Sequence, residues 1–301
     1  MKILVIGSTG LLGTDLCRVL SRNHELIGWA RKPASSPRNL PERLLFETVD
    51  ITDRERVADG IRRHRPAVTI LTAAMSDVDA CEKEPSLAMK INAHAVQHVA
   101  EGCAAAGSLL VAISTDYVFD GLAGRAYKES DSPHPINQYG LSKLEGEKMV
   151  LSAGARSVVI RVSGLFGNGR LNFVSSAAEA FLNNRPVRVV TDQINSPSST
   201  ADLALALEAF VSQIAEDPAL PTVLHLANTG AASRLDVAEE IASVLKKPAS
   251  LIEKTTWPQL NRPAKRPTYT ELDSRLFTRL TGFAMKPWRQ ALREYLLQNY
   301  S

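Results

Sequence analysis

The stretch that decides the fold is KILVIGSTGLLGTDLCRVLSR, residues 2–22. It opens with a continuous apolar run, which is typical of a strand buried on both faces of a parallel sheet. Its second half repeats apolar side chains at helical spacing. Three glycines lie between these halves, where backbone N–H groups can reach a pyrophosphate at the helix N-terminus. The stretch therefore predicts the first strand, phosphate loop and helix of a dinucleotide-binding sheet.

The three glycines have different expected roles. Gly7 makes the tight turn, Gly10 allows a close approach to phosphate, and Gly13 lets the helix pack on the strand. Their spacing is GxxGxxG rather than the GxGxxG of many dehydrogenases, and glycines after a strand can also form a plain turn. The strand before the loop and the helix after it favour the phosphate loop.

Strand-like and helix-like segments alternate through the first half of the chain. We expect strands at 25–30, 44–49, 67–74, 108–115 and 157–162, and helices at 54–64, 86–106 and 137–153. This β-α-β alternation predicts an α/β fold, a doubly wound parallel (Rossmann) sheet with helices on both faces. The helix at 54–64 is expected to be capped by Thr52 or Asp53.

After residue 163 the alternation loosens into Gly, Asn and Pro clusters. Later segments predict a strand at 187–190, a helix at 202–216, a strand at 222–227 and helices near 233–247 and 287–299. We therefore expect a smaller, interrupted C-terminal domain over the carboxyl edge of the sheet. Residues 1–163 and 190–228 are assigned to the dinucleotide-binding domain, and residues 164–189 and 229–301 to the substrate domain.

The overall composition excludes several functions. The 301 residues carry 35 basic and 32 acidic side chains, too balanced to indicate a nucleic-acid partner. Cys17, Cys81 and Cys103 show no CxxC pair, so we expect reduced thiols in a cytoplasmic protein. The sequence shows no signal-peptide pattern and no apolar stretch of membrane length. The six histidines form no ligand-spaced cluster, so no metal site is expected.

The residues at the end of the second strand indicate which nicotinamide cofactor is bound. A carboxylate there binds the ribose 2′-hydroxyl of NAD, but this chain has Arg31 and Lys32. A guanidinium suits a 2′-phosphate, which favours NADPH, with NADH as the alternative. Asp50 ends the third strand and fits an adenine contact, although it could also cap the next helix.

A catalytic pair is predicted in NQYGLSKLEGEK, residues 137–148. Tyr139 and Lys143 are four residues apart, so a helix places both on one face. The plain alternative is an exposed aromatic ring leaning on a lysine stem. The fifth strand ends in STDYVFDG (114–121), which brings the Thr115 hydroxyl to the carboxyl edge where ligands bind.

The chain resembles an extended short-chain dehydrogenase/reductase, and within that group the dTDP-4-dehydrorhamnose reductases. The resemblance runs over nearly the whole length. Its motifs are GSTGLLG, DITD, the AA of LTAAMSDVDACE, INAHAV (91–96), STDYVFDG, YGLSK, IRVSGLFG (160–167), DQINSPSSTADLA (192–204) and RPTYTELD (266–273).

The resemblance implies that Tyr139 protonates a ketone oxygen while hydride from the nicotinamide attacks its carbon. Lowering a phenol pKa from ~10 to ~7 requires about 4 kcal/mol of phenolate stabilisation. Lys143 and the oxidised nicotinamide are expected to supply it, and Lys143 to hold the ribose. Thr115 is expected to hydrogen-bond the carbonyl oxygen. Asn92 is expected to set the helix geometry or hold a relay water.

The resemblance also implies contacts. Those to the cofactor are Gly7, Gly10, Leu11, Leu12, Gly13, Arg31, Asp50, Ile51, Ala73, Ala74, Met75, Asn92, Tyr139 and Lys143. Those to the substrate are Thr115, Asp116, Ser163, Gly164 and Arg266. Gly164 stands where these reductases commonly carry a tryptophan, and Tyr269 and Thr270 replace Asn and Ser, so the identity of the sugar stays open.

The leading hypothesis is an NADPH-dependent reductase of a nucleotide-activated 4-keto-6-deoxy sugar, with dTDP-4-dehydro-L-rhamnose as the first choice and dTDP-L-rhamnose as the product. One alternative is a sugar-nucleotide epimerase or dehydratase. Another is a non-catalytic NADP-binding regulatory subunit, like the β subunit of methionine adenosyltransferase. The expected partner is the nucleotide sugar, without nucleic acid or membrane, and a homodimer is left open.

Overall fold

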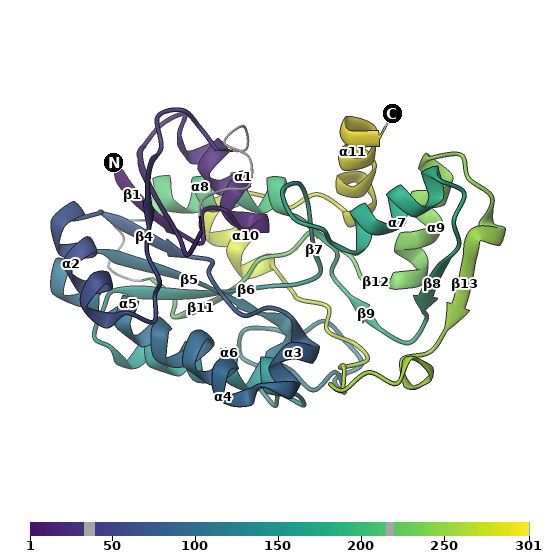
Figure 1. Ribbon diagram of the computed structural model, residues 1–301, viewed down its shortest axis with the longest axis horizontal. Helices are drawn as coiled ribbons and strands as arrows, with labels where there is room; N and C mark the ends of the chain where they lie inside the picture. The colour runs from purple at the N-terminus through teal and green to yellow at the C-terminus, as the bar shows by residue number, and fades with distance from the viewer. Residues whose placement is uncertain (33–39, 215–219, 301) are drawn as a thin grey trace.

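The computed structural model describes residues 1–32, 40–214 and 220–300, and its main feature is a seven-stranded parallel sheet (Figure 1). The strand order is β11-β6-β5-β4-β1-β2-β3. The strands are β1 (Lys2–Ile6), β2 (Glu25–Ala30), β3 (Leu45–Thr48), β4 (Val68–Leu71), β5 (Leu109–Thr115), β6 (Ser157–Val162) and β11 (Val223–His225). The order reverses at β1, which pairs with β2 on one side and β4 on the other. Ligands bind at such a reversal in doubly wound sheets, so the predicted fold class is confirmed.

Two helical layers cover the two faces of the sheet, as Figure 1 shows. On one face lie α1 (Leu11–Leu20), α8 (Thr200–Ile214) and α10 (Arg275–Thr281); on the other lie α2 (Arg54–His64), α5 (Ala95–Ala106) and α6 (Gln138–Ser152). The side chains of β1 alternate between the layers: Ile3 and Val5 pack with the first, Leu4 and Ile6 with the second. Because both faces are buried, the strand reads as a continuous apolar run.

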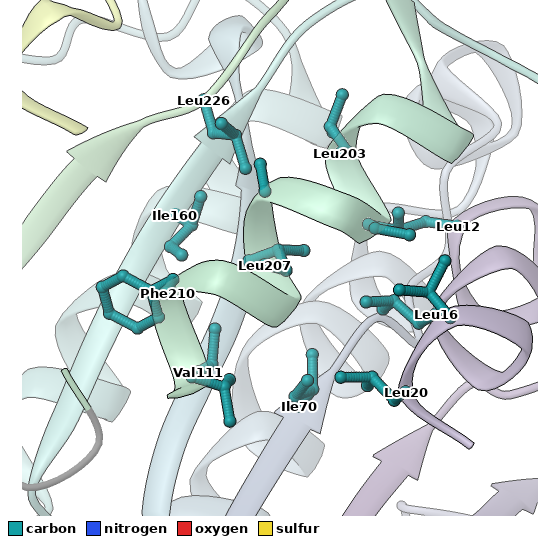
Figure 2. Packing of buried hydrophobic residues seen from close by; sticks show 14 of the residues in the cluster. Leu12, Leu16, Leu20, Ile70, Val111, Ile160, Leu203, Leu207, Phe210 and Leu226 are labelled. Carbon is teal, nitrogen blue, oxygen red and sulfur yellow. The ribbon is translucent and has the colours of Figure 1, made fainter. Parts of the chain in front are cut away.

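The first hydrophobic core shows how distant segments meet. Figure 2 shows leucines of α1 and α8 facing each other above strand side chains that include Ile70, Val111 and Ile160. The helix predicted at 202–216 is thus α8, which begins two residues earlier; the last two predicted positions, 215 and 216, lie outside the described residues. Phe210 of α8 stacks on Phe277 of α10 with ring centroids 5.9 Å apart. Part of the C-terminal chain therefore returns to the sheet.

The helix predicted over 86–106 is not continuous. The chain forms α4 (Pro85–Met89), the π-helical turn η2 (Lys90–His94) and then α5. Close packing accompanies the interruption, because a Cβ placed on Gly146 of α6 would lie 2.1 Å from the Asn92 carbonyl oxygen. Such π turns occur frequently at functional sites. Helical periodicity predicted the ends of this segment but not its wider turn.

The C-terminal region forms a smaller second lobe, at the right of Figure 1. Its helices α7 (Phe173–Leu182), α9 (Arg234–Val244) and α11 (Trp288–Tyr300) share a separate hydrophobic core. Strand β8 (Val187–Val190) pairs with β13 (Ile252–Thr255) in this lobe. Two further strand pairs are β7 (Leu165–Phe166) with β10 (Ser198–Ser199) and β9 (Ile194–Asn195) with β12 (Ala232–Ser233). The remaining short helices are α3 (Val78–Lys83), η3 (Asp116–Val118), η4 (Ala249–Leu251) and η5 (Pro258–Leu260).

Side-chain caps fix where several helices begin. Asp53, not Thr52, caps α2 by accepting a hydrogen bond from the Arg56 N–H at 3.1 Å. Asn137 caps α6 by accepting a hydrogen bond from the Gly140 N–H at 2.8 Å. This cap fixes where the helix that carries Tyr139 begins. Within the described residues, no helix is both long and apolar enough to span a bilayer.

Candidate active site

The glycine loop lies at the reversal point between β1 and β4. Gly7 has φ +91°, and a Cβ there would lie 2.5 Å from Thr72 Oγ1. A Cβ on Gly13 would lie 2.0 Å from the Gly7 carbonyl oxygen, so only glycine lets α1 start this close to the strand. The expected roles of Gly7 in the turn and Gly13 in packing are therefore confirmed. At Gly7 and Gly10 the loop carries no Cβ atom, so the backbone there can approach a pyrophosphate closely.

The residues expected around the adenine end lie in two environments. Arg31 is exposed at the end of β2, whereas Leu12 and Ile51 pack in the two hydrophobic cores. Asp50 accepts hydrogen bonds from the N–H and the hydroxyl of Thr52, both at 2.9 Å. Burial would raise the Asp50 pKa, but these hydrogen bonds and the charge of Arg31 lower it overall. Asp50 therefore stays ionised and stabilises the turn before α2.

Asn92 joins the loop after β4 to helix α6. Its Oδ1 accepts from the Met75 N–H at 2.8 Å, and its Nδ2 donates to the Met75 carbonyl and to Ser142 Oγ, each at 3.0 Å. The side chain is fully buried. Asn92 thus fixes the segment of Ala73, Ala74 and Met75, which the sequence predicts beside the cofactor.

Thr115 and Tyr139 come together at the carboxyl end of β5. The two side chains are neighbours, and Thr115 lowers the pKa of the Tyr139 phenol. Thr115 Oγ1 also donates to Asp116 Oδ1 at 3.1 Å and accepts from the Tyr117 N–H at 3.2 Å. The Tyr117 ring stands edge-on to Tyr139 with centroids 5.7 Å apart. The phenol predicted as a proton donor therefore faces the predicted hydroxyl.

The predicted lowering of the Tyr139 pKa is wrong when only the protein's own groups act on the phenol. Burial raises this pKa well above its ordinary value, the neighbouring Thr115 hydroxyl lowers it, and the charge of Asp116 raises it further. Lys143 does not contact the phenol in the described structure; its Nζ donates to the Ile113 carbonyl at 2.7 Å. Helical spacing places both residues on one side of α6, but the Lys143 ammonium group donates its hydrogen bond to a backbone carbonyl of β5.

Lys143 is a buried cation held in place by the sheet and its own helix. Burial lowers its pKa to about 8, while Glu147, one turn further along α6, raises it. A cavity of about 10 Å³ lies against Lys143, Asn92 and Ser114, enough for about one water molecule.

A buried ion pair next to Lys143 was missed by the sequence analysis. Glu147 Oε2 accepts from Arg161 Nη2 at 2.7 Å, and Oε1 accepts from Arg161 Nε at 3.0 Å and from Ser114 Oγ. Both charged side chains are about 95% buried. An available signal was the arginine inside SVVIRV, since a charge in a buried strand requires a partner.

Asp116, predicted to contact substrate, is bound to hydroxyl groups of the protein. Its Oδ2 accepts from Ser163 Oγ at 2.8 Å and from Thr270 Oγ1 at 2.6 Å. Burial raises its pKa, and the hydrogen bonds from Thr270, Ser163 and Thr115 oppose this. Ser163 and Thr270 therefore link the end of β5 to the C-terminal segment, and Thr270 is one of the residues that departs from the family pattern.

Gly164 has a structural reason for its departure from the family pattern. Its φ is +58°, and a Cβ there would lie 2.9 Å from the Ser196 carbonyl oxygen and 3.0 Å from Pro197 Cα. A tryptophan would be both strained and crowded at this position. Tyr269 is likewise engaged elsewhere, as a donor to the Glu271 carboxylate.

Arg266, another predicted substrate residue, lies in a group of aromatic rings. Its guanidinium is 4.6 Å from the Trp257 ring and 5.9 Å from the Tyr117 ring, and Nη2 is 3.2 Å from Asp79 Oδ1. The side chain is 10% exposed. The Tyr117 ring therefore contacts both the Arg266 guanidinium and the Tyr139 ring. Trp288 and Tyr295 of α11 are buried in the core of the second lobe. The described residues contain no cluster of three or more His, Cys, Asp or Glu suited to a metal ion.

Comparison with known proteins gives the family. Residues 1–301 match the family model of the RmlD substrate binding domain. The dTDP-4-dehydrorhamnose reductase of Streptomyces griseus is 34% identical over 292 residues, which cover 97% of this chain and 91% of that protein. The spore coat polysaccharide biosynthesis protein SpsK of Bacillus subtilis is 33% identical over 301 residues, 100% of this chain and 98% of that protein.

A solved structure agrees with these relatives. The crystal structure of dTDP-4-dehydrorhamnose reductase from Bacillus anthracis, in complex with NADP, has a TM-score of 0.87, 29% identity and 99% coverage of both chains. Full-length matches in sequence and in structure therefore show that this chain belongs to the dTDP-4-dehydrorhamnose reductase family of extended short-chain dehydrogenases/reductases.

Proposed function

We propose that the protein is an NADPH-dependent reductase of the 4-keto group of a nucleotide-activated 6-deoxy sugar, with dTDP-4-dehydro-L-rhamnose as substrate and dTDP-L-rhamnose as product. One observation carries this: in a member of this reductase family, the Tyr139 phenol lies beside Thr115 at the carboxyl end of β5, close enough for Thr115 to lower its pKa. Reduction of a ketone needs one proton donor at the oxygen, and this pair provides it.

The proton step follows from the environment of Tyr139. Its raised pKa keeps the phenol protonated at neutral pH, which is the form that an acid catalyst requires. The oxygen of a ketone becomes far more basic as its carbon accepts hydride, so a weak acid suffices in the transition state. Thr115 can hydrogen-bond the developing alkoxide when its hydroxyl proton turns from Asp116 to the substrate oxygen. Asp116 in turn fixes the Thr115 hydroxyl at 3.1 Å.

The residues present fit a dinucleotide. The Gly7 turn and the Gly10 N-cap of α1 present a backbone that no Cβ covers, at the reversal point of the sheet. When bound, the reduced nicotinamide supplies the hydride. Lys143 would hold the ribose hydroxyls. Arg31 would meet a 2′-phosphate, and the NADP in the Bacillus anthracis relative supports this choice.

The other reactions considered are not favoured. A dehydratase needs a second carboxylate after Thr115, but the chain continues with Asp116 and Tyr117. Asp116 is also bound to three hydroxyl groups of the protein. A non-catalytic regulatory role does not explain why Thr115, Tyr139 and Lys143 are all kept.

The division into two domains also stays a proposal. Separate hydrophobic cores in the sheet region and in the α7, α9 and α11 lobe support it. Phe277 and Met285 pack in the sheet core, so the substrate region sends one segment back to the first domain. Free, buried Cys17, Cys81 and Cys103 fit a cytoplasmic location. Light scattering can test the homodimer.

One assay tests the proposal. The protein is mixed with NADPH and dTDP-4-dehydro-L-rhamnose, and the absorbance of the reduced nicotinamide is followed. We expect Tyr139→Phe to lower kcat by about 10²–10⁴-fold, the usual contribution of a general acid. Tyr295→Phe, which removes a hydroxyl in the second lobe, is the control and keeps its activity. Equal turnover of Tyr139→Phe and wild type would contradict the proposed acid.

A further inference from the structure

A cavity that the proposed reaction does not use lies between α2 and α5, which pack side by side on one face of the sheet (Figure 1). Its volume is about 500 Å³, which is in the range of small-molecule sites. Its lining residues are distinct from the catalytic group and from the glycine loop. The polar side chains that line it are Arg54, Arg62, Arg65, His98 and Glu101.

Small side chains on both helices create the cavity. Ala58 of α2 and Ala105 of α5 line it and fill little of the space between the helices. Gly102 of α5 lets the helices pack closely at the base, because a Cβ there would lie 2.9 Å from Cδ1 of the buried Ile61. The base of the cavity therefore belongs to the packed core, and its walls are two regular helices.

The charges around the cavity are mainly positive. Three arginines and one glutamate line it, which gives a net charge of +2 when the histidine is neutral. Glu101 forms an ion pair with Arg54 at 3.0 Å. Arg62 lies 2.5 Å from Asp59, but these side chains are 75% and 66% exposed, and exposed ion pairs contribute little. Among the described residues, Arg65 has no carboxylate within ion-pair distance. The cavity therefore favours an anion.

Arg65 lines the cavity from a backbone position that usually favours glycine. It is the C-cap of α2, with φ +47° and ψ +57°, in the left-handed region where a Cβ is disfavoured. Strained positions of this kind cluster at ligand-binding sites. Arg54 begins α2 and Arg62 follows eight residues later, about 12 Å along the helix. Positive side chains are thus spread along the length of the cavity.

His98 adds an oriented polar group to this lining. Its Nδ1 donates to the Ile51 carbonyl oxygen at 3.2 Å, and a carbonyl can only accept, so Nδ1 carries the proton. This hydrogen bond orients the ring and leaves Nε2 as the ring atom that can reach a ligand. In a neutral imidazole with the proton on Nδ1, Nε2 accepts a hydrogen bond, which suits a hydroxyl group of a ligand.

We propose that the cavity between α2 and α5 is a second ligand site, and that its ligand is a small molecule with a chain of phosphate groups, such as a nucleoside triphosphate. Guanidinium groups match phosphate oxygens in bidentate, charge-assisted contacts. A chain of phosphates can reach several arginines at once, and the hydroxyl groups of a ribose suit His98. The site stands independently of the proposed reduction, because its lining residues take no part in that reaction.

Calorimetry tests the site on protein saturated with NADP⁺ and dTDP, which fill the phosphate positions of the proposed reductase site. The probes are inorganic tripolyphosphate and ATP. We expect both to bind, and Arg65→Gln to weaken both by about tenfold to a hundredfold, as loss of a charged hydrogen bond does. Ala58 is exposed, so Ala58→Leu keeps every charge and every core contact but fills the cavity; it should weaken binding as much. Arg188→Gln removes an exposed arginine on β8 and is the matched control.

Each outcome decides for or against the site. If neither probe binds, or if Arg65→Gln binds both as tightly as wild type, the site is wrong. If Ala58→Leu binds as wild type does, the anions associate only with exposed charges, and the cavity is again not their site. An equal loss in Arg188→Gln would show a general effect of charge and would also overturn it. Tighter binding of ATP than of tripolyphosphate supports a nucleoside triphosphate, and equal binding supports the phosphate chain alone.

Two further measurements keep these results separate from other effects. Circular dichroism verifies that each variant is folded. Reduction of the 4-keto sugar is assayed independently, so failure of that reaction leaves the calorimetric result for the cavity unchanged.

Discussion

At the scale of single residues, burial controls the chemistry of the site. The Tyr139 phenol, the Asp116 carboxylate and the Lys143 ammonium all have pKa values moved toward their neutral forms, with burial as the largest cause. A dry environment strengthens hydrogen bonds and makes each unpaired charge costly. The family resemblance implied that Thr115 and Tyr139 lie in one site, whereas sequence spacing placed only Tyr139 with Lys143. It could not predict the direction of the Tyr139 shift, because neighbours from other segments set it.

The Lys143 pKa predicts how activity and stability change with pH. Because this pKa falls from 10.5 to about 8 in the folded protein, Lys143 loses its proton above pH 8. If the cation holds the cofactor, kcat/KM falls as the pH rises through about 8. Stability changes in the opposite sense: the unfolded state binds more protons between pH 8 and 10.5, so the free energy of unfolding from this group rises across that window.

Two measurements check the Lys143 prediction. A pH profile of kcat/KM for wild type should lose activity above about pH 8, whereas Lys143→Arg, whose charge persists, should not show this limb. Lys143→Met should lose the corresponding rise in unfolding free energy in urea titrations between pH 8 and 10.5. A wild-type profile that stays flat to pH 10 would show that the cation is not required.

At the scale of elements, α6 is the helix that the site depends on. The N-cap Asn137 fixes where the helix begins, and Gly146 lets it pack closely on η2. Glu147 forms an ion pair with Arg161 of β6. The sequence predicted the helix and its Tyr139 face. It did not predict the Glu147–Arg161 pair, because the two residues are 14 positions apart on different elements and only the packing of α6 on the sheet joins them.

Breaking the Glu147–Arg161 pair should destabilise the protein strongly. Glu147→Gln leaves Arg161 as an uncompensated buried charge, which typically costs about 3–5 kcal/mol. The double variant Glu147→Leu with Arg161→Met removes both charges and should recover much of this. The measurement is the free energy of unfolding in urea.

An exposed pair on the same helix is the control. Lys148 and Glu145 are 60% and 30% exposed, so Lys148→Gln should cost less than about 1 kcal/mol. If Glu147→Gln costs no more than Lys148→Gln, the buried pair does not stabilise the fold.

At the scale of the whole molecule, the site joins the sheet to the C-terminal chain. Asp116 at the end of β5 accepts from Thr270, and Arg266 contacts Tyr117 on one side and Trp257 on the other. A substrate bound at the carboxyl end of β5 would lie where the sheet meets the C-terminal chain. Ligand binding should therefore stabilise the molecule as a unit.

Cofactor binding gives the whole-molecule prediction. NADPH at about 100 times its Kd should raise the unfolding free energy by about 2.7 kcal/mol. Arg31→Ala, with a tenfold weaker affinity, should show only about 1.4 kcal/mol at the same concentration. NADH lacks the 2′-phosphate, so its effect should be equal in both proteins. Thermal unfolding with each cofactor measures this, and an equal NADPH effect in both would show that Arg31 does not read the phosphate.

The sequence by itself determined the fold class and the order of strands and helices along the chain. Buried parallel strands and amphipathic helices leave local periodicities, and the Gly7 turn needs a residue without a Cβ, so all of these are visible in short stretches. Only the tertiary structure decided the partners: Ile113 for Lys143, Glu147 for Arg161 and Thr270 for Asp116. Buried polar groups take partners from distant segments, and which segments meet depends on the packing of the whole core, not on local pattern.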